Sequence, residues 1–424
     1  MRNRTFLLVD INSYFATLLQ QENPKLRNKP VVIVKDLGRN CIIAASKEAK
    51  KKGVKTGTNL AIAKRLAPDV VEMKAEFDLY LSATNKLNKL FEQISPQVDI
   101  YSLDEAFIEI SDCLKNLYPD PVLLGKKIQQ KIKDELGDWV TANVGIGPNR
   151  FLAKMAAEIS PKGSVFAIDQ ENLDCVLAEV GFDDVCGIGG ALSRKLKMMG
   201  VFHPYQIRFY SEDDFKPLFG PFWSKELLKM AYGREPHHLA LLDENDRTKL
   251  DPTSISRSIT LWNLTDDEAQ IKKVLYSLTR EVIYKARRLK LAGRRVSLSL
   301  SGSNFLNNFT WRRHLTLSCH LDHTASMFEQ IYKKIYLSWQ RNFKPIKFKV
   351  ALGLLKTTKE INPSLLPDWK KQESLESALD EISQRFGLFS VRSALLLDEK
   401  DLIHPEVTGF FGDKKFQFNK LNQS

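Results

Sequence analysis

Three carboxylates in the first quarter of the chain could bind a divalent cation. Asp10 ends the apolar run TFLLVDIN, which predicts a buried strand, and Asp104 and Glu105 lie in YSLDEAF, which predicts a turn between two strands. Carboxylates among aliphatic and aromatic neighbours need compensation, which a hard cation such as Mg²⁺ supplies. Three carboxylates from two strands suffice for a two-metal phosphoryl-transfer site. A lone Asp after a strand is more often a turn former, however, and the spacing does not show that the strands are neighbours.

A glycine-rich turn is a second candidate site. Gly187, Gly189 and Gly190 in VCGIGGALSRKLKMMGV permit a tight turn between two helices. Backbone N–H groups at such a turn, and at the N-terminus of the helix after it, can bind a phosphate. Lys195 and Lys197 add positive charge one or two turns later. The same kind of turn also occurs as plain helix–helix packing, so both interpretations stay open.

The positive charge of the chain is concentrated in one segment. The 424 residues carry 63 Lys and Arg against 51 Asp and Glu, a net charge of +12. Residues 251–360 contain 20 of the basic and 8 of the acidic side chains, so this segment holds the whole excess. A basic domain on an otherwise neutral chain is expected for a protein that binds a polyanion such as nucleic acid, and is equally typical of a solubilising surface.

Composition limits the class of protein further. Hydrophobic residues make up 43% and charged residues 27%, the balance of a globular protein, and the length predicts about two to four domains. No run reaches the ~20 apolar residues that span a bilayer, and the start of the chain lacks a secretory signal, so we expect no membrane segment. The 5 cysteines include no CxxC pair, which argues against a disulfide framework or a zinc–cysteine site and favours the cytoplasm.

The elements that must position these groups begin with an α+β core. Up to about residue 165, strand-like apolar runs and amphipathic helices such as Pro121–Leu136 mix without regular βαβ alternation. Shorter helical segments follow between residues 170 and 240. The polar, acidic stretch at 241–251 is interpreted as a linker, and a further helix is expected at 374–386.

The basic segment predicts a strand, a helix, two strands, a helix and a strand. The alternation of Val296, Leu298 and Leu300 predicts a strand with one buried face, and helices are expected over 266–291 and 324–339. This β-α-β-β-α-β succession is that of ferredoxin-like domains. The basic residues on or beside its strands are Arg257, Arg294, Arg295, Arg312, Arg313, Lys347 and Lys349.

Taken together, these segments resemble the Y-family translesion DNA polymerases, most closely the UmuC-type (ImpB/MucB/SamB-like) bacterial SOS polymerases. VDINSYFA at 9–16 is similar to the first catalytic motif of that family, and IYSLDEAFIEIS at 100–111 to the second. NVGIGPNRFLAKMA at 143–156 is similar to the following strand–helix motif, and DVCGIGGALSRKLKMMG at 184–200 to the thumb helix-hairpin-helix. The motifs occur in family order, and the basic segment falls where the family has its little finger.

The resemblance implies an α+β right-hand polymerase with palm, fingers, helix-hairpin-helix thumb and ferredoxin-like little finger. The activity it implies is DNA-directed, low-fidelity DNA synthesis past damaged template bases, in DNA repair and the SOS response. The expected boundaries are palm 1–30 and 77–168, fingers 31–76, thumb 169–240, linker 241–252, little finger 253–360 and C-terminal tail 361–424.

The resemblance also assigns roles to individual residues. Asp10, Asp104 and Glu105 would be the catalytic ligands of two Mg²⁺ ions, with the backbone carbonyl of Ile11 as a further ligand. One ion would activate the primer 3′-hydroxyl, and the other would hold the triphosphate and neutralise the pyrophosphate. The residues expected to contact DNA are Gly187, Gly189 and Lys195 in the thumb, and Arg257, Arg294, Arg295, Arg312 and Arg313 in the little finger.

The incoming nucleotide would meet a second set of residues. Phe15 matches the aromatic steric gate that excludes a ribose 2′-hydroxyl, and Lys50 matches a basic contact to the triphosphate. The expected nucleotide-binding residues are Asn12, Ser13, Tyr14, Phe15, Lys50 and Lys162. Asn12 replaces an Asp of many members, but UmuC-type sequences share the Asn.

Three departures from the family pattern do not remove a metal ligand. Lys47 replaces a Tyr that contacts the nucleotide in many members, and Leu19 replaces a Glu. Ser160 stands where a Lys is usual, and Lys162, two residues later, is the candidate substitute.

The expected partners are primer–template DNA and deoxynucleoside triphosphates, for a cytoplasmic monomer. NPSLLPDW at 362–369 and QRFGLF at 384–389 each resemble a sliding-clamp peptide only in part, which leaves clamp binding open. Two other functions remain as alternatives. A catalytically silent DNA-binding scaffold of the same family would not need the three carboxylates. A palm-type nucleotidyl cyclase would not need a thumb hairpin or a basic domain.

Overall fold

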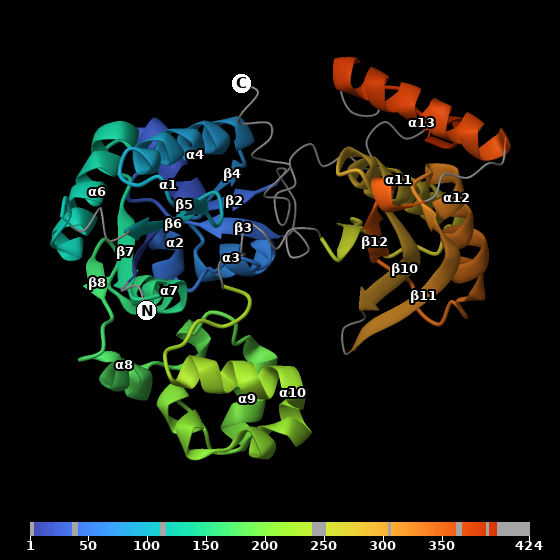
Figure 1. Ribbon diagram of the computed structural model, residues 1–424. Helices are drawn as coiled ribbons and strands as arrows, with labels where there is room; N and C mark the ends of the chain where they lie inside the picture. The colour runs from blue at the N-terminus through green and yellow to red at the C-terminus, as the bar shows by residue number, and fades with distance from the viewer. Residues whose placement is uncertain are drawn as a thin grey trace. The chain divides into compact units, whose positions relative to one another are not determined.

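The computed structural model describes residues 4–35, 41–110, 116–239, 252–303, 307–361, 367–386 and 390–396. The chain divides into two compact units, Met1–Leu241 and Leu242–Lys420, which are drawn in Figure 1 and are described separately below. In the described part of the chain, no helix is long and apolar enough to cross a membrane.

A five-stranded sheet forms the centre of the N-terminal unit. The strand order is β5-β6-β1-β7-β8, and every neighbouring pair is antiparallel except β7 and β8. The strands are β1 (Thr5–Ile11), β5 (Val98–Ile100), β6 (Glu105–Ile110), β7 (Ala142–Gly147) and β8 (Val165–Ala167). The almost wholly apolar run of β1 therefore occupies the central position, hydrogen-bonded on both sides, where such a run is expected.

The side chains of β1 alternate between two apolar cores. Leu7 and Val9 pack with α1 (Tyr14–Glu22), α4 (Phe77–Glu92) and α6 (Pro121–Leu136) on one face. Phe6 and Leu8 pack on the other face, which α7 (Arg150–Ile159) covers, and Figure 1 shows α4 and α7 on opposite sides of the sheet. Because side chains alternate with a period of two, Asp10 lies on the α7 face.

The helical segment after β8 shares the core on the α7 face. This segment comprises α8 (Leu173–Glu179), η2 (Phe182–Asp184), α9 (Gly190–Met198), η3 (Pro204–Phe209) and α10 (Glu212–Ala231). Its buried residues Phe182, Leu196 and Phe215 belong to one apolar cluster with Phe6 and Leu8 of the sheet. The five-stranded sheet and the helical segment are thus built around a common core, as far as the described residues extend.

A small three-stranded sheet lies between α1 and α4 in the sequence. Its order is β3-β2-β4, with β2 (Val31–Val34), β3 (Ile42–Ala45) and β4 (Val71–Lys74), and it carries α2 (Lys47–Lys51) and α3 (Leu60–Leu66). A 3-10 turn, η1 (Pro24–Leu26), precedes it. The four residues of β2 are all fully buried. The strand β4 runs parallel to β2 and is not among the strands predicted from the sequence. VEMK does alternate apolar and polar residues, but over only four positions.

The ends of α6 match the prediction because local capping fixes them. Asp120 accepts hydrogen bonds from the backbone N–H groups of Val122 and Leu123, and Pro121 occupies the first helical position, where a missing N–H costs nothing. Gly137, with a φ of 103°, follows the last residue and ends the helix.

A four-stranded antiparallel sheet forms the C-terminal unit, in the order β11-β10-β12-β9. The strands are β9 (Ser254–Thr260), β10 (Leu291–Ser303), β11 (Asn308–Leu321) and β12 (Lys347–Thr357). Two long helical segments, α11 (Glu268–Arg288) and the one that begins with α12 (Thr324–Glu329), connect them. The predicted β-α-β-β-α-β succession is confirmed, and the pairs β9–β10 and β11–β12 are each split by an inserted strand.

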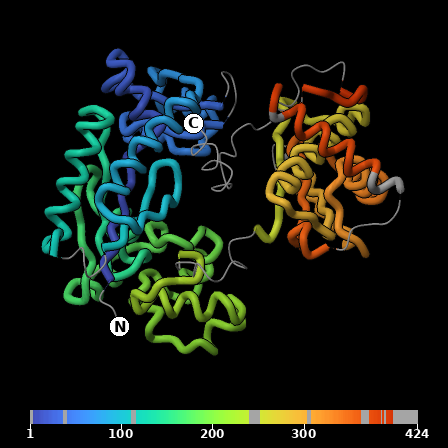
Figure 2. The backbone as a smooth tube through the Cα atoms, turned by 45° about the horizontal axis from the view of Figure 1, so that its top comes forward, coloured from blue at the N-terminus to red at the C-terminus, as the bar shows by residue number. Residues whose placement is uncertain are grey.

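The second of these helical segments differs from the continuous α-helix that the sequence predicts over 324–339. The α-helix ends at Glu329 and continues as a π-helix over Gln330–Ile335 and a 3-10 turn over Tyr336–Ser338. Ile331 and Ile335 of this π-helical segment are both fully buried in the core of the unit. Short turns at Thr358–Glu360 and Ala394–Leu396 and the helix α13 (Pro367–Phe386) complete the unit. Figure 2 shows α13 along the helical side of this unit.

Candidate active site

The two strands whose proximity the sequence left open are direct neighbours. β1 and β6 pair antiparallel, and the register places Asp10 opposite Glu105. Both side chains fall on the α7 face, since Phe107, two residues after Glu105, belongs to the same core as Phe6 and Leu8. The structure therefore brings Asp10 and Glu105 together, although 94 residues separate them in sequence.

Asp104 is joined to this pair through the backbone. The carbonyl oxygen of Asp104 accepts a 2.9 Å hydrogen bond from the Ile11 N–H, which locks the turn onto the end of β1. The Asp104 carboxylate accepts a hydrogen bond from the hydroxyl of Ser102 within the same turn. Among the described residues, no three metal-ligating side chains already converge on one point. Asp104 would have to turn away from Ser102 to complete the set.

The pKa of the Asp10 carboxyl indicates a cation site. Burial, together with the negative charges of Glu105 and Asp104, raises the pKa of its carboxyl from 3.8 to about 7. Burial also raises the pKa of Glu105. A buried cluster of carboxylates that resist ionisation is one that a divalent cation would stabilise, so the residues present fit the Mg²⁺ ions that the family resemblance implies.

Lys154 is the counter-charge that the protein itself supplies. It projects from α7, its side chain is only 7% exposed, and its Nζ lies 2.7 Å from Oε2 of Glu105. Burial alone would lower the pKa of this ammonium, but the Glu105 carboxylate outweighs burial and raises it. Lys154 therefore stays charged and holds Glu105 in place. The residue lies inside a motif quoted above without being assigned a role; a Lys among the apolar side chains of α7 is the signal that could have found it.

Two further lysines converge near Asp10 from different elements. Lys50 of α2 donates a 2.9 Å hydrogen bond from Nζ to Oγ of Ser13, a residue held at a φ of 51° just before α1. Partial burial and the charge of Lys162 lower the pKa of Lys50, and Lys162 also acts on Asp10, opposing the rise of its pKa. Two lysines that repel each other beside a carboxylate cluster are suited to an anion with several charges, such as a triphosphate.

Ser160 is not available for the role that a Lys has at this position in the family. Its side chain is buried, donates a hydrogen bond to the Ala157 carbonyl at 3.1 Å, and lies 3.2 Å from Nδ2 of Asn143. Asn143, which is fully buried, also accepts a hydrogen bond from the N–H of Gly163. The side chain of Asn143 thus holds the loop that carries the exposed Lys162. It also accepts a hydrogen bond from the side-chain amide of Asn12.

The aromatic residues that follow Ser13 have different environments. Tyr14 is buried, and its hydroxyl donates to the Tyr80 carbonyl at 2.7 Å and lies 2.8 Å from Oγ1 of Thr84. Phe15 is half-buried, with its ring centroid 4.4 Å from that of Tyr80. The structure therefore places Tyr14 in the core, whereas Phe15 keeps one side accessible and a fixed orientation.

Lys47, the second departure from the family pattern, contacts an aromatic ring. Its ammonium lies 4.0 Å from the ring centroid of Trp139, and the guanidinium of Arg27 lies 5.2 Å from the same centroid. Trp139 donates from Nε1 to Oε1 of Gln20, which also bonds Glu48 of α2. Lys47 thus helps attach the start of α2 to the loop before β7, a role that the sequence did not indicate.

The glycine-rich turn has the tight turn and the following helix that the sequence predicts, but its Lys195 is already hydrogen-bonded within the protein. Gly187 has a φ of 95°, and a Cβ there would lie 2.4 Å from Cε1 of His238, so only glycine fits. Gly189 immediately precedes α9. Lys195, in contrast, donates from Nζ to the Leu218 carbonyl at 2.8 Å and is held against the neighbouring helix α10.

The C-terminal sheet has one face that none of the described helices of its unit covers, and this face carries cations among hydroxyl groups. The buried residues Val296, Leu298 and Leu300 define the opposite, helix-covered face. Register places Arg312, Ser299, Lys349 and Ser258 in one row across the four strands, on the open face. Exposed cations and hydroxyls in rows are suited to phosphate contacts.

Not all of the predicted DNA-binding arginines lie on the open face. Arg295 is exposed there, next to a half-buried Arg294 at an irregularity of β10. Arg257 follows the period of the buried Ile255 and forms a buried ion pair with Glu281 of α11. Arg313 donates from Nη1 to Oγ of Ser338 on the helix side. The structure thus separates Arg257 and Arg313 from the others.

The five-stranded sheet carries paired carboxylates and shares its core with a helical segment, and a β-α-β-β-α-β unit follows in the chain. This combination is that of the right-hand polymerase folds. Residues 9–158 match the impB/mucB/samB family, and residues 252–365 match the C-terminal domain of the same family. The fold is similar to that of a Y-family DNA polymerase chimera of Dbh and Dpo4, with a TM-score of 0.67 at 21% identity, over 84% of this chain and 100% of that chain.

Similar full-length proteins point the same way. The chain is 29% identical to DNA polymerase IV of Pelotomaculum thermopropionicum over 406 residues, 92% of this chain and 95% of the relative. It is 27% identical to DNA polymerase IV 2 of Bacillus subtilis over 91% of this chain and 93% of that protein. It is 30% identical to DNA polymerase IV of Saccharolobus solfataricus over 66% of this chain and 77% of that protein. The chain belongs to the Y family of DNA polymerases, which confirms the resemblance and the α+β right-hand fold.

Proposed function

We propose that this protein is a DNA-directed DNA polymerase that extends primers past damaged template bases by two-metal nucleotidyl transfer. The observation that carries the proposal is the direct pairing of Asp10 with Glu105, a buried carboxylate pair in which the pKa of Asp10 is raised to about 7. Synthesis past lesions is supported by membership of the Y family and by the similarity to proteins named DNA polymerase IV.

The residues of the chain would act in three ways. Asp10, Glu105 and the Asp104 carboxylate, with the Ile11 carbonyl, would hold two Mg²⁺ ions, which when bound activate the primer 3′-hydroxyl and neutralise the leaving pyrophosphate. Lys154 would keep Glu105 ionised and oriented. Lys50 and Lys162 would bind the triphosphate oxygens.

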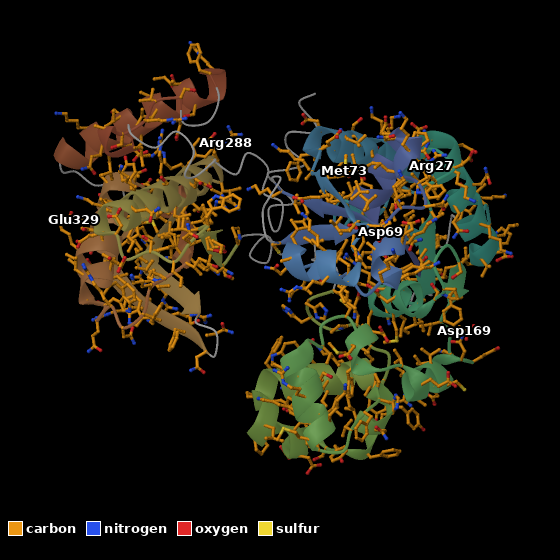
Figure 3. The ribbon with its side chains drawn as sticks, turned by 180° about the vertical axis from the view of Figure 1, so that it is seen from behind. Arg27, Asp69, Met73, Asp169, Arg288 and Glu329 are labelled. Carbon is orange, nitrogen blue, oxygen red and sulfur yellow. The ribbon has the colours of Figure 1, made fainter. Side chains whose placement is uncertain are left out.

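Primer extension tests the activity. Wild-type protein with primer–template, deoxynucleoside triphosphates and Mg²⁺ should extend the primer, and Asp104→Ala should lower extension by on the order of 10²- to 10³-fold, as expected for loss of a preorganised charge. Asp69→Ala is the matched control, because Asp69 (labelled in Figure 3) is a surface carboxylate of the same unit, 59% exposed and paired with Lys52. No extension by the wild type would favour the silent scaffold, and cyclic nucleotide formation without template would favour the cyclase.

Sugar selection is expected to depend on Phe15. Replacing Phe15 by Ala removes the accessible ring beside Tyr80, so discrimination against ribonucleotides should fall by on the order of 10²-fold. The measurement is the ratio of kcat/KM for a deoxynucleotide and the matching ribonucleotide. Phe77→Ala is the control, since its ring also packs edge-on against Tyr80, at 6.2 Å between centroids. An unchanged ratio in Phe15→Ala would remove this assignment.

A further inference from the structure

The helix α13 lies beyond the family domain yet is attached to it. The match to the C-terminal family domain ends at residue 365, and α13 begins at Pro367. Figures 1 and 2 both show α13 along the side of the C-terminal unit that α11 and α12 form. This side is opposite the open face of the sheet.

The attachment is made by acidic groups of α13. Asp380 lies 2.8 Å from Nε of Arg287 in an ion pair whose side chains are 13% (Arg287) and 19% (Asp380) exposed. Glu376, one turn earlier, accepts a 2.7 Å hydrogen bond from the backbone N–H of Thr324, the first residue of α12. No described side chain of α13 belongs to the apolar core of the unit, and Leu375 is 60% exposed. The ion pair and the hydrogen bond to Glu376 are the charged contacts that hold α13, and Gln372 adds a neutral contact with the Ser326 hydroxyl.

The partner of these carboxylates is a basic face of α11. Arg280, Tyr284, Arg287 and Arg288 are spaced so that they share one side of the helix. Glu376 and Asp380 act electrostatically on Arg280, and Arg288, labelled in Figure 3, acts on Asp380. Burial raises the pKa of Asp380 despite the hydrogen bond from Arg287, so desolvation of this carboxylate offsets part of the attraction between the two groups.

We propose that this face of α11 is a second phosphate-binding surface, that α13 covers it in the free protein, and that duplex DNA competes with α13 for the α11 arginines. The inference rests on the proposed function only for the choice of DNA as the polyanion. The charged contacts of α13 with α11 are weakened by salt and can be displaced by a denser array of negative charge, which the phosphate backbone provides.

The test compares two double variants of the full chain that lose the same charge. Glu376→Gln with Asp380→Asn removes the two carboxylates that face α11, whereas Glu373→Gln with Glu381→Gln removes two exposed carboxylates of the same helix. The probe is a blunt DNA duplex, followed by fluorescence anisotropy between 50 and 200 mM salt. If two arginines become free for phosphates, affinity of the first variant should fall about tenfold more over this range than that of the wild type, since each contact contributes ~0.9 to the slope. The second variant should keep the wild-type slope.

A second measurement does not depend on the variants. Hydrogen exchange of α13 in the wild type should accelerate when the duplex is added at low salt. Equal slopes in the two double variants, or an α13 that stays protected on saturating DNA, would overturn the proposal. A third variant separates this from the proposed function: Arg312→Ala with Lys349→Ala should flatten the salt slope of the open sheet face. If the salt slope of this variant stays unchanged, the open sheet face is not the main DNA contact. The hydrogen exchange of α13 still tests whether DNA displaces this helix.

Discussion

Replacing Asp10 by Asn should abolish primer extension and, in the metal-free protein, stabilise the palm. The loss of activity follows from the loss of a metal ligand and should be at least on the order of 10²- to 10³-fold. The gain in stability follows from burial: Asp10 is ionised at neutral pH only against the cost that raises its pKa from 3.8 to about 7. Asn has nearly the same shape and does not incur this cost.

The gain should depend on pH in a defined direction. Because the folded protein binds the Asp10 proton more tightly than the unfolded chain, wild-type stability falls as pH rises from about 4 to about 7, and the whole penalty is present above that range. A shift of this size corresponds to about 4 kcal/mol. Asp10→Asn should therefore be more stable than the wild type by about this amount at pH 8 and almost equal to it at pH 4.

Hydrogen exchange of β1 in the full chain, with a chelator present, measures this difference locally. Added Mg²⁺ should then raise the protection of the wild type and leave Asp10→Asn unchanged, because only the wild type keeps the ligand. Two outcomes would contradict the account: a variant that is less stable at pH 8, or a variant that responds to Mg²⁺ as the wild type does.

Replacing Lys154 by Met should be strongly destabilising and should alter the pH dependence of catalysis. The change leaves the buried Glu105 carboxylate without the ammonium 2.7 Å away, a loss that typically costs about 3–5 kcal/mol. Without that charge the pKa of Glu105 rises further, so the acid limb of the kcat/KM profile should move to higher pH. A merely structural role for Lys154 would lower stability without moving this limb.

Two further variants show whether the ion pair with Glu105 is the reason for the loss of stability. Lys154→Met combined with Glu105→Gln removes both charges and should recover most of the stability but no activity. Glu158→Gln is the matched control, because its carboxylate is 42% exposed and 3.9 Å from the same ammonium, so it should change stability by less than ~1 kcal/mol. If the double variant were no more stable than Lys154→Met, the ion pair would not be the reason for the loss.

The part of the active site that sequence predicts well is the part that local pattern determines. A buried strand with Asp10 near its end and a turn at Asp104 follow from apolar runs and their interruption, and both are found, with β1 ending one residue later at Ile11. The register that places Asp10 opposite Glu105 is a contact between distant segments, so only the family resemblance connected them. Lys154 is missed for the same reason, since its partner lies 49 residues earlier on another element.

One predicted DNA contact of the C-terminal sheet, Arg257, lies on the helix-covered face, and strand alternation already indicates this position. The prediction from sequence groups Arg257 with Arg295 and Arg312 because all three lie on strands. Yet Ile255 is an apolar residue two positions before Arg257, and a period of two places both on the covered face, where the structure has them. Arg312 and Arg313 are adjacent, so only one of them can point to the open face.

The tail could be predicted only in part. The helix was expected from 374 and begins at Pro367, a residue favoured in the first turn of a helix. Its docking on α11 depends on side chains about 90 residues apart and has no local signal. Of the two clamp-peptide candidates, residues 362–366 and 387–389 lie outside the described residues, so clamp binding stays a prediction, as do the domain boundaries.

The apolar cluster that joins Phe6 and Leu8 of the palm sheet to Phe182, Leu196 and Phe215 of the helical segment has an evolutionary consequence. A recombination crossover near residue 170 would split one hydrophobic interior between two parents, whereas a crossover between residues 239 and 252 would leave each interior whole, because the C-terminal unit has its own. Hybrids of this lineage should therefore arise, and be recoverable by domain shuffling, with the second junction far more often than with the first. The C-terminal unit would then be an exchangeable cassette, while the five-stranded sheet and the helical segment after β8 are inherited as a single block.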